Sequence, residues 1–170
     1  MKTMTRQYKY PLALAIAASI ATGPILAQSA IEHHVWQDAR KFEPYSRTAE
    51  SITGAIRLSG NKQFATPGSK MTITFGTGKK AQLTSVGASW RQWDDVDGKR
   101  VTAEVFKLDK DPGTLLNRNT LCGKAARYLV FHESLSFGVS LLGVAVFEGS
   151  KEPEDINSPG LCGTFNYSAD

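Results

Sequence analysis

Apolar and polar residues alternate in short runs from about Glu50 to the end of the chain, and turn signals separate the runs. A period of two is typical of strands that bury one face. About seven or eight such strands predict a mainly β, single-domain antiparallel β-sandwich or small β-barrel. The runs cover residues 52–58, 71–75, 81–86, 101–108, 127–132, 137–147 and 161–167.

Glycine and proline mark the expected turns between these runs. They occur at Ser59-Gly60-Asn61, at Gly76-Thr77-Gly78, at Asp97-Gly98 and within 109–113. These residue types supply the backbone angles that tight turns require. The run 137–147 is apolar on both faces, which predicts the strand most covered by the rest of the protein.

The segment 28–47, which precedes the predicted β domain (48–170), carries a weak helical pattern. Ile31, Val35, Ala39 and Phe42 recur near the helical period, and Pro44 would end the helix. A helix this close to a new N-terminus could equally be frayed. Both alternatives, a short helix and a frayed segment, stay open.

Residues 1–27 have the pattern of a secretory signal peptide. Lys2, Arg6 and Lys9 give a basic start, an apolar run covers 11–26, and the small residue Ala27 marks the cleavage position. Cleavage two or three residues later is the alternative. A membrane helix is disfavoured because the run is shorter than the roughly 20 residues that a bilayer needs. We therefore expect a periplasmic or secreted protein without a membrane span after cleavage.

Removal of the signal changes the charge balance. The chain has 20 Lys and Arg against 16 Asp and Glu, a net charge of +4 and a pI of about 9.1. Residues 1–27 hold three of the bases and no acid, so 17 bases and 16 acids remain, a net charge of +1. Proteins that bind nucleic acids usually carry a clustered basic face. The sequence therefore predicts no nucleic-acid partner.

The two cysteines, Cys122 and Cys162, predict a structural disulfide. An exported protein meets an oxidising environment, and neither cysteine has metal-ligand spacing. A redox pair would favour a Cys-x-x-Cys spacing, which the sequence lacks. Closing a loop of this size would contribute about 4 kcal/mol in the chain-entropy model.

Candidate catalytic residues are few. His132 lies in a strand-like run beside Glu133 and Ser134, but the sequence has no Gly-x-Ser-x-Gly elbow. His132 is therefore interpreted as a half-buried strand residue, and a hydrolase built on it is the least favoured function. His33-His34 is too small a set of ligands to predict a metal site. We expect no catalytic site, metal or other cofactor.

An acidic loop resembles a calcium-binding loop only in part. If Gly98 were its central glycine, Glu104 would be the last ligand, but Trp93 would then occupy the first ligand position. A tryptophan cannot coordinate calcium. A hairpin turn at Asp97-Gly98 is the favoured interpretation.

The candidate recognition surface is Trp90, Arg91, Trp93, Asp94 and Asp95. Trp90 and Trp93 would lie on opposite faces of a regular strand, so both can reach the core only if the strand ends or bulges between them. One exposed tryptophan among charged residues suits stacking on a sugar or anchoring a protein. The alternative, slightly favoured, is that both tryptophans cap the barrel core.

Several short motifs resemble those of small exported proteins of unknown function from Gram-negative bacteria. They are Thr48-Ala49-Glu50-Ser51-Ile52-Thr53-Gly54, two Leu-Cys-Gly motifs at 121–123 and 161–163, and the stretches 143–149 and 164–167. The resemblance covers about residues 48–167. It implies export and paired cysteines and supplies no activity.

Three functions follow as hypotheses. The favoured one is a non-enzymatic exported β-domain that binds a protein, a glycan or a small ligand. The second is a structural or stress-protective protein of the cell envelope. The third is the hydrolase described above.

Overall fold

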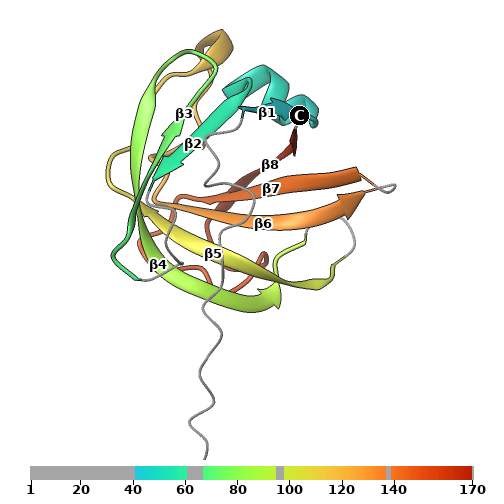
Figure 1. Cartoon of the computed structure of the whole chain (residues 1–170). Helices are drawn as coiled ribbons and strands as arrows, with labels where there is room; N and C mark the ends of the chain where they lie inside the picture. Colours follow the sequence, from blue (N-terminus) through green and yellow to red (C-terminus); the bar gives the residue numbers. More distant parts are fainter. Residues whose placement is uncertain (1–40, 61–66, 95–97, 137–138, 170) are drawn as a thin grey trace, which may run out of the picture.

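Eight antiparallel strands form a closed β-barrel in the computed structural model (Figure 1). The structure describes residues 41–60, 67–94, 98–136 and 139–169. Each strand pairs with the next one along the chain, and β1 pairs with β8 to close the barrel. This confirms the mainly β prediction and distinguishes the barrel from the sandwich. The strands are β1 (Lys41–Pro44), β2 (Ile56–Gly60), β3 (Lys70–Thr74), β4 (Lys80–Gln92), β5 (Arg100–Leu108), β6 (Tyr128–Ser136), β7 (Val139–Phe147) and β8 (Leu161–Ala169).

The inside of the barrel is filled by apolar side chains. Alternate residues of each strand point inward, as the period of two requires. Phe106 and Phe131 pack edge to face there, with ring centroids 5.5 Å apart. The same cluster includes Phe42, Ile56, Leu58, Met71, Ile73, Leu83, Leu108, Leu129, Leu142, Val144, Val146, Phe165 and Tyr167.

A second core lies on the outer face of the barrel, beneath the loop 148–160. Val105 belongs to this core while its neighbour Phe106 points inward. Ile156 of the loop packs into the outer core, and its backbone N–H donates to the Gln92 carbonyl at 2.9 Å. Residues 141–147 of β7 are therefore buried on both faces. The expectation that this strand is the most covered agrees with its burial.

The N-terminal part of the barrel differs from the sequence-based expectation. Phe42, the last residue of the proposed helix, lies in strand β1, and residues 31–40 lie outside the described part of the chain. β1 pairs with both β2 and β8, and the Phe42 side chain is fully buried. Pairing across the barrel therefore decides the conformation of this segment, which its local periodicity could not indicate.

The predicted strand 52–58 is also wrong in its first half. Ala49–Thr53 form a short π-helical turn, η1, and the strand begins only at Ile56. Gly54 leaves the turn with φ of +61°, a conformation that favours glycine. The Thr53 and Tyr167 hydroxyls hydrogen-bond at 2.7 Å, which fixes η1 to β8. Burial raises the pKa of Tyr167, so this hydroxyl stays protonated.

Turns and strand lengths were predicted unevenly. The hairpin turn at 76–78 is confirmed, with Gly78 at φ of +81°. Ser59 and Gly60, expected in a turn, belong instead to β2, and β4 continues six residues beyond its predicted end at Val86. In the described part of the chain, no helix has the length and apolar character needed to cross a bilayer.

Candidate functional site

The far end of the β4–β5 hairpin carries the predicted recognition residues. A β-bulge interrupts the pairing between Ser85 and Gly87, and Gly87 has φ of +136°. Before the bulge, Ser85 pairs with the inward-facing Phe106; after it, Ala88 pairs with Glu104. The extra residue therefore moves the inward face of β4 from odd to even positions.

The orientation of Trp90 follows from this shift. It pairs with Thr102, so it lies on the face that continues from the barrel interior past Glu104 to the rim. Its side chain is 57% exposed. The guanidinium carbon of Arg100 lies 5.4 Å from the centre of the Trp90 ring, a cation–π contact. The ring is thus presented to solvent in a position supported by a neighbouring strand.

Trp93 has the opposite environment. It is fully buried in the outer core, where its ring meets Phe147 edge to face at 6.4 Å. Its Nε1–H donates to the Ser89 hydroxyl at 3.0 Å. The interpretation that both tryptophans cap the core is therefore wrong for Trp90. Trp93 anchors the end of β4, and Trp90 is the tryptophan that a ligand can reach.

The other predicted residues do not form one patch with Trp90. Arg91 is the strand neighbour of Trp90 and pairs with Val101 of the outer face. It lines a groove of about 290 Å³ together with Glu152 and Glu154 of the loop 148–160. Asp94 is only 4% exposed, and Asp95 lies outside the described residues. The hairpin thus has an aromatic face and a separate charged groove.

Arg100 and Glu104 were not predicted to belong to the recognition surface, and Glu104 was considered only as a calcium ligand. Arg100 is ten positions from Trp90, and only the pairing of the hairpin brings them together. Glu104 is 1% exposed on the inward face and accepts a hydrogen bond from the Ser85 hydroxyl at 2.7 Å. A buried carboxyl group requires polar partners, and this serine supplies one. The predicted hairpin turn at Asp97-Gly98, of which Asp97 lies outside the described residues, was the signal that could have identified Arg100 once it was extended into a pairing register.

Of the candidate hydrolytic residues, the two whose side chains the structure describes, His132 and Glu133, lie on opposite faces of β6. His132 is 2% exposed on β6, opposite Gly143 of β7. Glu133 is exposed and, as the next residue of the strand, lies on the other face. The side chain of Ser134 lies outside the described part. No group of three His, Cys, Asp or Glu suited to a metal occurs among the described residues.

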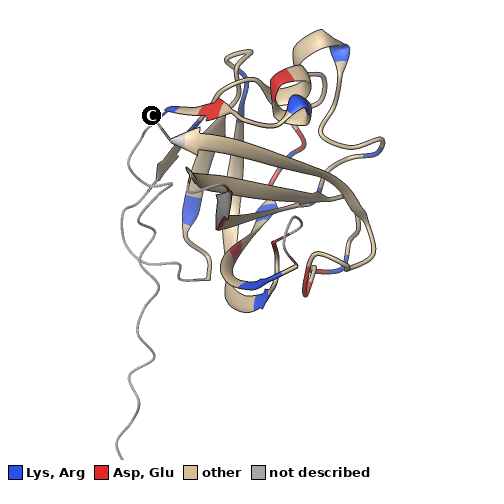
Figure 2. Cartoon of the chain, turned by 90° about the vertical axis from the view of Figure 1, so that its right-hand side faces the viewer, with Lys and Arg blue, Asp and Glu red and all other residues tan. Residues whose placement is uncertain are grey.

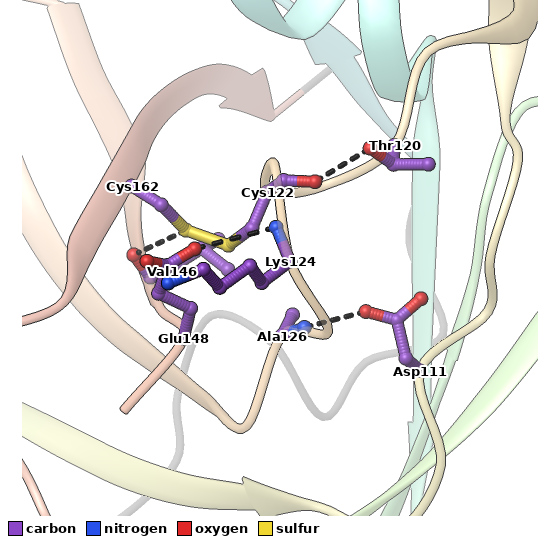
Figure 3. The surroundings of a disulfide bond; sticks show 8 residues. All are labelled: Asp111, Thr120, Cys122, Lys124, Ala126, Val146, Glu148 and Cys162. Carbon is purple, nitrogen blue, oxygen red and sulfur yellow. Dashed lines mark hydrogen bonds between the residues drawn. A yellow bond between two sulfur atoms is a disulfide. The ribbon is translucent and has the colours of Figure 1, made fainter. Parts of the chain in front are cut away.

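The predicted disulfide between Cys122 and Cys162 is confirmed (Figure 3). It joins the long β5–β6 connection to the start of β8, with the two Cα atoms 5.4 Å apart. Asp111 strengthens the same connection by accepting the Ala126 N–H at 2.6 Å. The bond therefore fastens an irregular segment to the strand that closes the barrel.

No family model matches the chain, and comparison with curated proteins and with solved structures also finds no match.

Proposed function

We propose that the mature chain is an exported, non-enzymatic β-barrel that binds a glycan of the cell envelope through Trp90. The observation that carries the proposal is the 57% exposure of this tryptophan, on a hairpin whose other tryptophan is fully buried. Tryptophan is enriched at binding interfaces because its ring joins a large apolar surface to a polar N–H group. The filled barrel interior favours recognition at the surface over a ligand held inside.

The chemistry around Trp90 favours a sugar. The flat ring offers an apolar face for the C–H groups of a pyranose, and the exposed Gln92 and Arg100 beside it offer hydrogen-bond donors for hydroxyl groups. The cation–π contact with Arg100 limits the motion of the ring, which lowers the entropy lost on binding. A protein that uses Trp90 as an anchor is the competing outcome of the test below.

Export is part of the proposal and rests on two features. The basic and apolar start of the chain has the pattern of a signal peptide. The disulfide fits an oxidising compartment, since disulfides rarely persist in the cytosol. Together they support a periplasmic or secreted location.

Replacement of Trp90 by alanine tests the binding function. The purified protein is titrated calorimetrically with fragments of envelope glycans, with lysozymes and with small apolar ligands. We expect a glycan fragment to bind, and Trp90→Ala to lose about 2 kcal/mol or more, at least a 30-fold loss of affinity. The melting temperature should hardly change, because the ring is exposed.

Tyr45→Ala is the matched control. Tyr45 is 52% exposed and follows β1, which pairs with β2 and β8 and not with the β4–β5 hairpin. Equal losses of affinity in the two variants, or no glycan bound at all, would contradict the proposal. Binding of a lysozyme instead, abolished by Trp90→Ala, would replace the glycan with a protein partner.

A structural role in the envelope is the second candidate. The closed barrel, its filled interior and its disulfide favour a protein selected for resistance to unfolding. This role predicts no specific ligand and a weakened envelope in a deletion strain. Normal resistance of that strain to detergent and osmotic stress would count against it.

A further inference from the structure

A groove of about 450 Å³ lies at the end of β4 opposite Trp90, between the β3–β4 turn and the segment that follows β5. We propose that this groove binds a phosphate group carried by a ligand. Its lining residues are Lys79, Lys80, Ala81, Gln82, Asp109, Lys110, Asp111 and Pro112. Three lysines and two aspartates thus contribute to one concave surface.

Charges of both signs are interspersed over the molecule in Figure 2. Whether a charged side chain of the groove is available to a ligand therefore depends on its hydrogen bonds and ion pairs within the protein. Both aspartates of the groove are bonded. Asp109 accepts from the Thr84 hydroxyl at 2.7 Å and from Lys70 Nζ at 2.9 Å. Asp111 accepts the Gly113 and Ala126 N–H groups, both at 2.6 Å. All four carboxylate oxygens therefore have partners supplied by the fold.

The three lysines of the groove have fewer hydrogen-bond and ion-pair partners within the protein than the two aspartates. Lys79 Nζ donates to the carbonyl oxygens of Pro112 and Thr114, which places its charge over the groove and leaves one of its three donors. Within the described ranges, neither Lys80 nor Lys110 forms an ion pair or a side-chain hydrogen bond. The groove therefore holds three lysines against two aspartates, and Lys70 pairs with one of those aspartates, so an excess of positive charge remains there.

This arrangement fits a phosphate better than a carboxylate. A phosphate group carries close to two negative charges near neutral pH and three acceptor oxygens, so it can meet three ammonium groups at once. The volume exceeds that of a single phosphate and falls within the usual range of small-ligand sites. The structure therefore favours a phosphorylated compound or a phospholipid headgroup, which share this chemistry.

Titration with inorganic pyrophosphate tests the site directly. The protein is followed by NMR and calorimetry in low salt, where exposed charges interact most strongly. We expect saturable binding with shifts of the backbone signals of residues 79–82 and 109–112. The double variant Lys80→Gln/Lys110→Gln should bind at least tenfold more weakly.

The control variant Lys124→Gln/Lys151→Gln removes the same charge at exposed positions outside the groove. It should bind like the original protein. Absence of saturable binding, or equal weakening in the two double variants, would overturn the proposal. Co-sedimentation with vesicles that contain phosphatidic acid, against phosphatidylcholine alone, identifies the source. Retention that depends on Lys80 and Lys110 indicates a lipid headgroup, and pyrophosphate binding without retention indicates a soluble phosphate compound.

Discussion

Gly143 and His132 face each other across β6 and β7, and the imidazole occupies the space that a larger residue at 143 would need. A Cβ added at Gly143 would lie 2.3 Å from His132 Nε2. His132 is buried, so its ring has little room to withdraw. We expect Gly143→Ala to lower the free energy of unfolding by about 1–3 kcal/mol, the usual cost of overpacking. Urea denaturation measures this change.

The double variant Gly143→Ala/His132→Ala isolates the clash. Removing the imidazole makes room for the new methyl group, so the alanine at 143 should cost much less in that background. Gly123→Ala is the control, because a Cβ there meets no atom within 4 Å. Equal costs with and without His132 would show that the clash is not the cause.

The roles of Trp90 and Trp93 show where local sequence reasoning ends. Their spacing correctly required different environments in a regular strand, and one tryptophan is indeed exposed. Which one is exposed depends on the bulge at Gly87, which shifts the inward face of β4 by one residue. A single glycine in a strand is compatible with a bulge but does not require one. The identity of the exposed ring therefore needed the structure.

Asp109 connects three strands at their outer face and gives the barrel a testable pH dependence. Asp109 directly follows the end of β5, and its carboxylate accepts hydrogen bonds from Lys70 of β3 and Thr84 of β4. The Lys70 and Thr84 hydrogen bonds lower the pKa of Asp109 below its ordinary value of 3.8. The resulting stability is complete above that value and is lost as the pH falls through the lowered pKa.

Asp109→Asn should therefore flatten the acid limb of the stability curve below pH 3.8, where wild-type protein loses this contribution. The effect is at most about 1 kcal/mol, because the ion pair is exposed to solvent. Thermal unfolding of both proteins between pH 2 and 7 measures it. Parallel curves over that range would show that Asp109 does not supply the dependence.

Most strands were predictable because their pattern is strong and their pairing is local. Residues 71–75 alternate cleanly and end at a glycine turn, and β3 forms there. Phe42 and Ala49–Thr53 were not predictable, because their conformations depend on β8, more than a hundred residues away. The lysine groove escaped detection for the same reason, since 79–82 and 109–112 meet only in the folded barrel.

The residues that stabilise the barrel and the residues proposed to bind ligands lie in different parts of the molecule. The filled interior and the outer core occupy the middle of the long strands, whereas Trp90 and the lysine groove lie at opposite ends of β4. Trp90, Lys80 and Lys110, which we expect to contact the ligands, are exposed and lie outside both cores. Loss of binding at Trp90 or Lys80 should therefore leave the melting temperature nearly unchanged, so binding and folding can be measured independently.

The disulfide acts on the whole fold because it restrains the strand that closes it. β1 has only four residues and pairs with the last residues of β8. The disulfide to Cys122 ties the start of β8 to the β5–β6 connection. A cross-link spanning 40 residues lowers the conformational entropy of the unfolded chain, which stabilises the folded state by about 4 kcal/mol.

For a domain of this size, Cys122→Ser/Cys162→Ser should lower the melting temperature by roughly 10 °C. Calorimetry with and without reductant measures this: the wild type should fall to the variant's value in reductant, and the variant should not respond. An unchanged melting temperature of the wild type in reductant, even after the protein has been unfolded in its presence, would contradict the stabilising role of the disulfide.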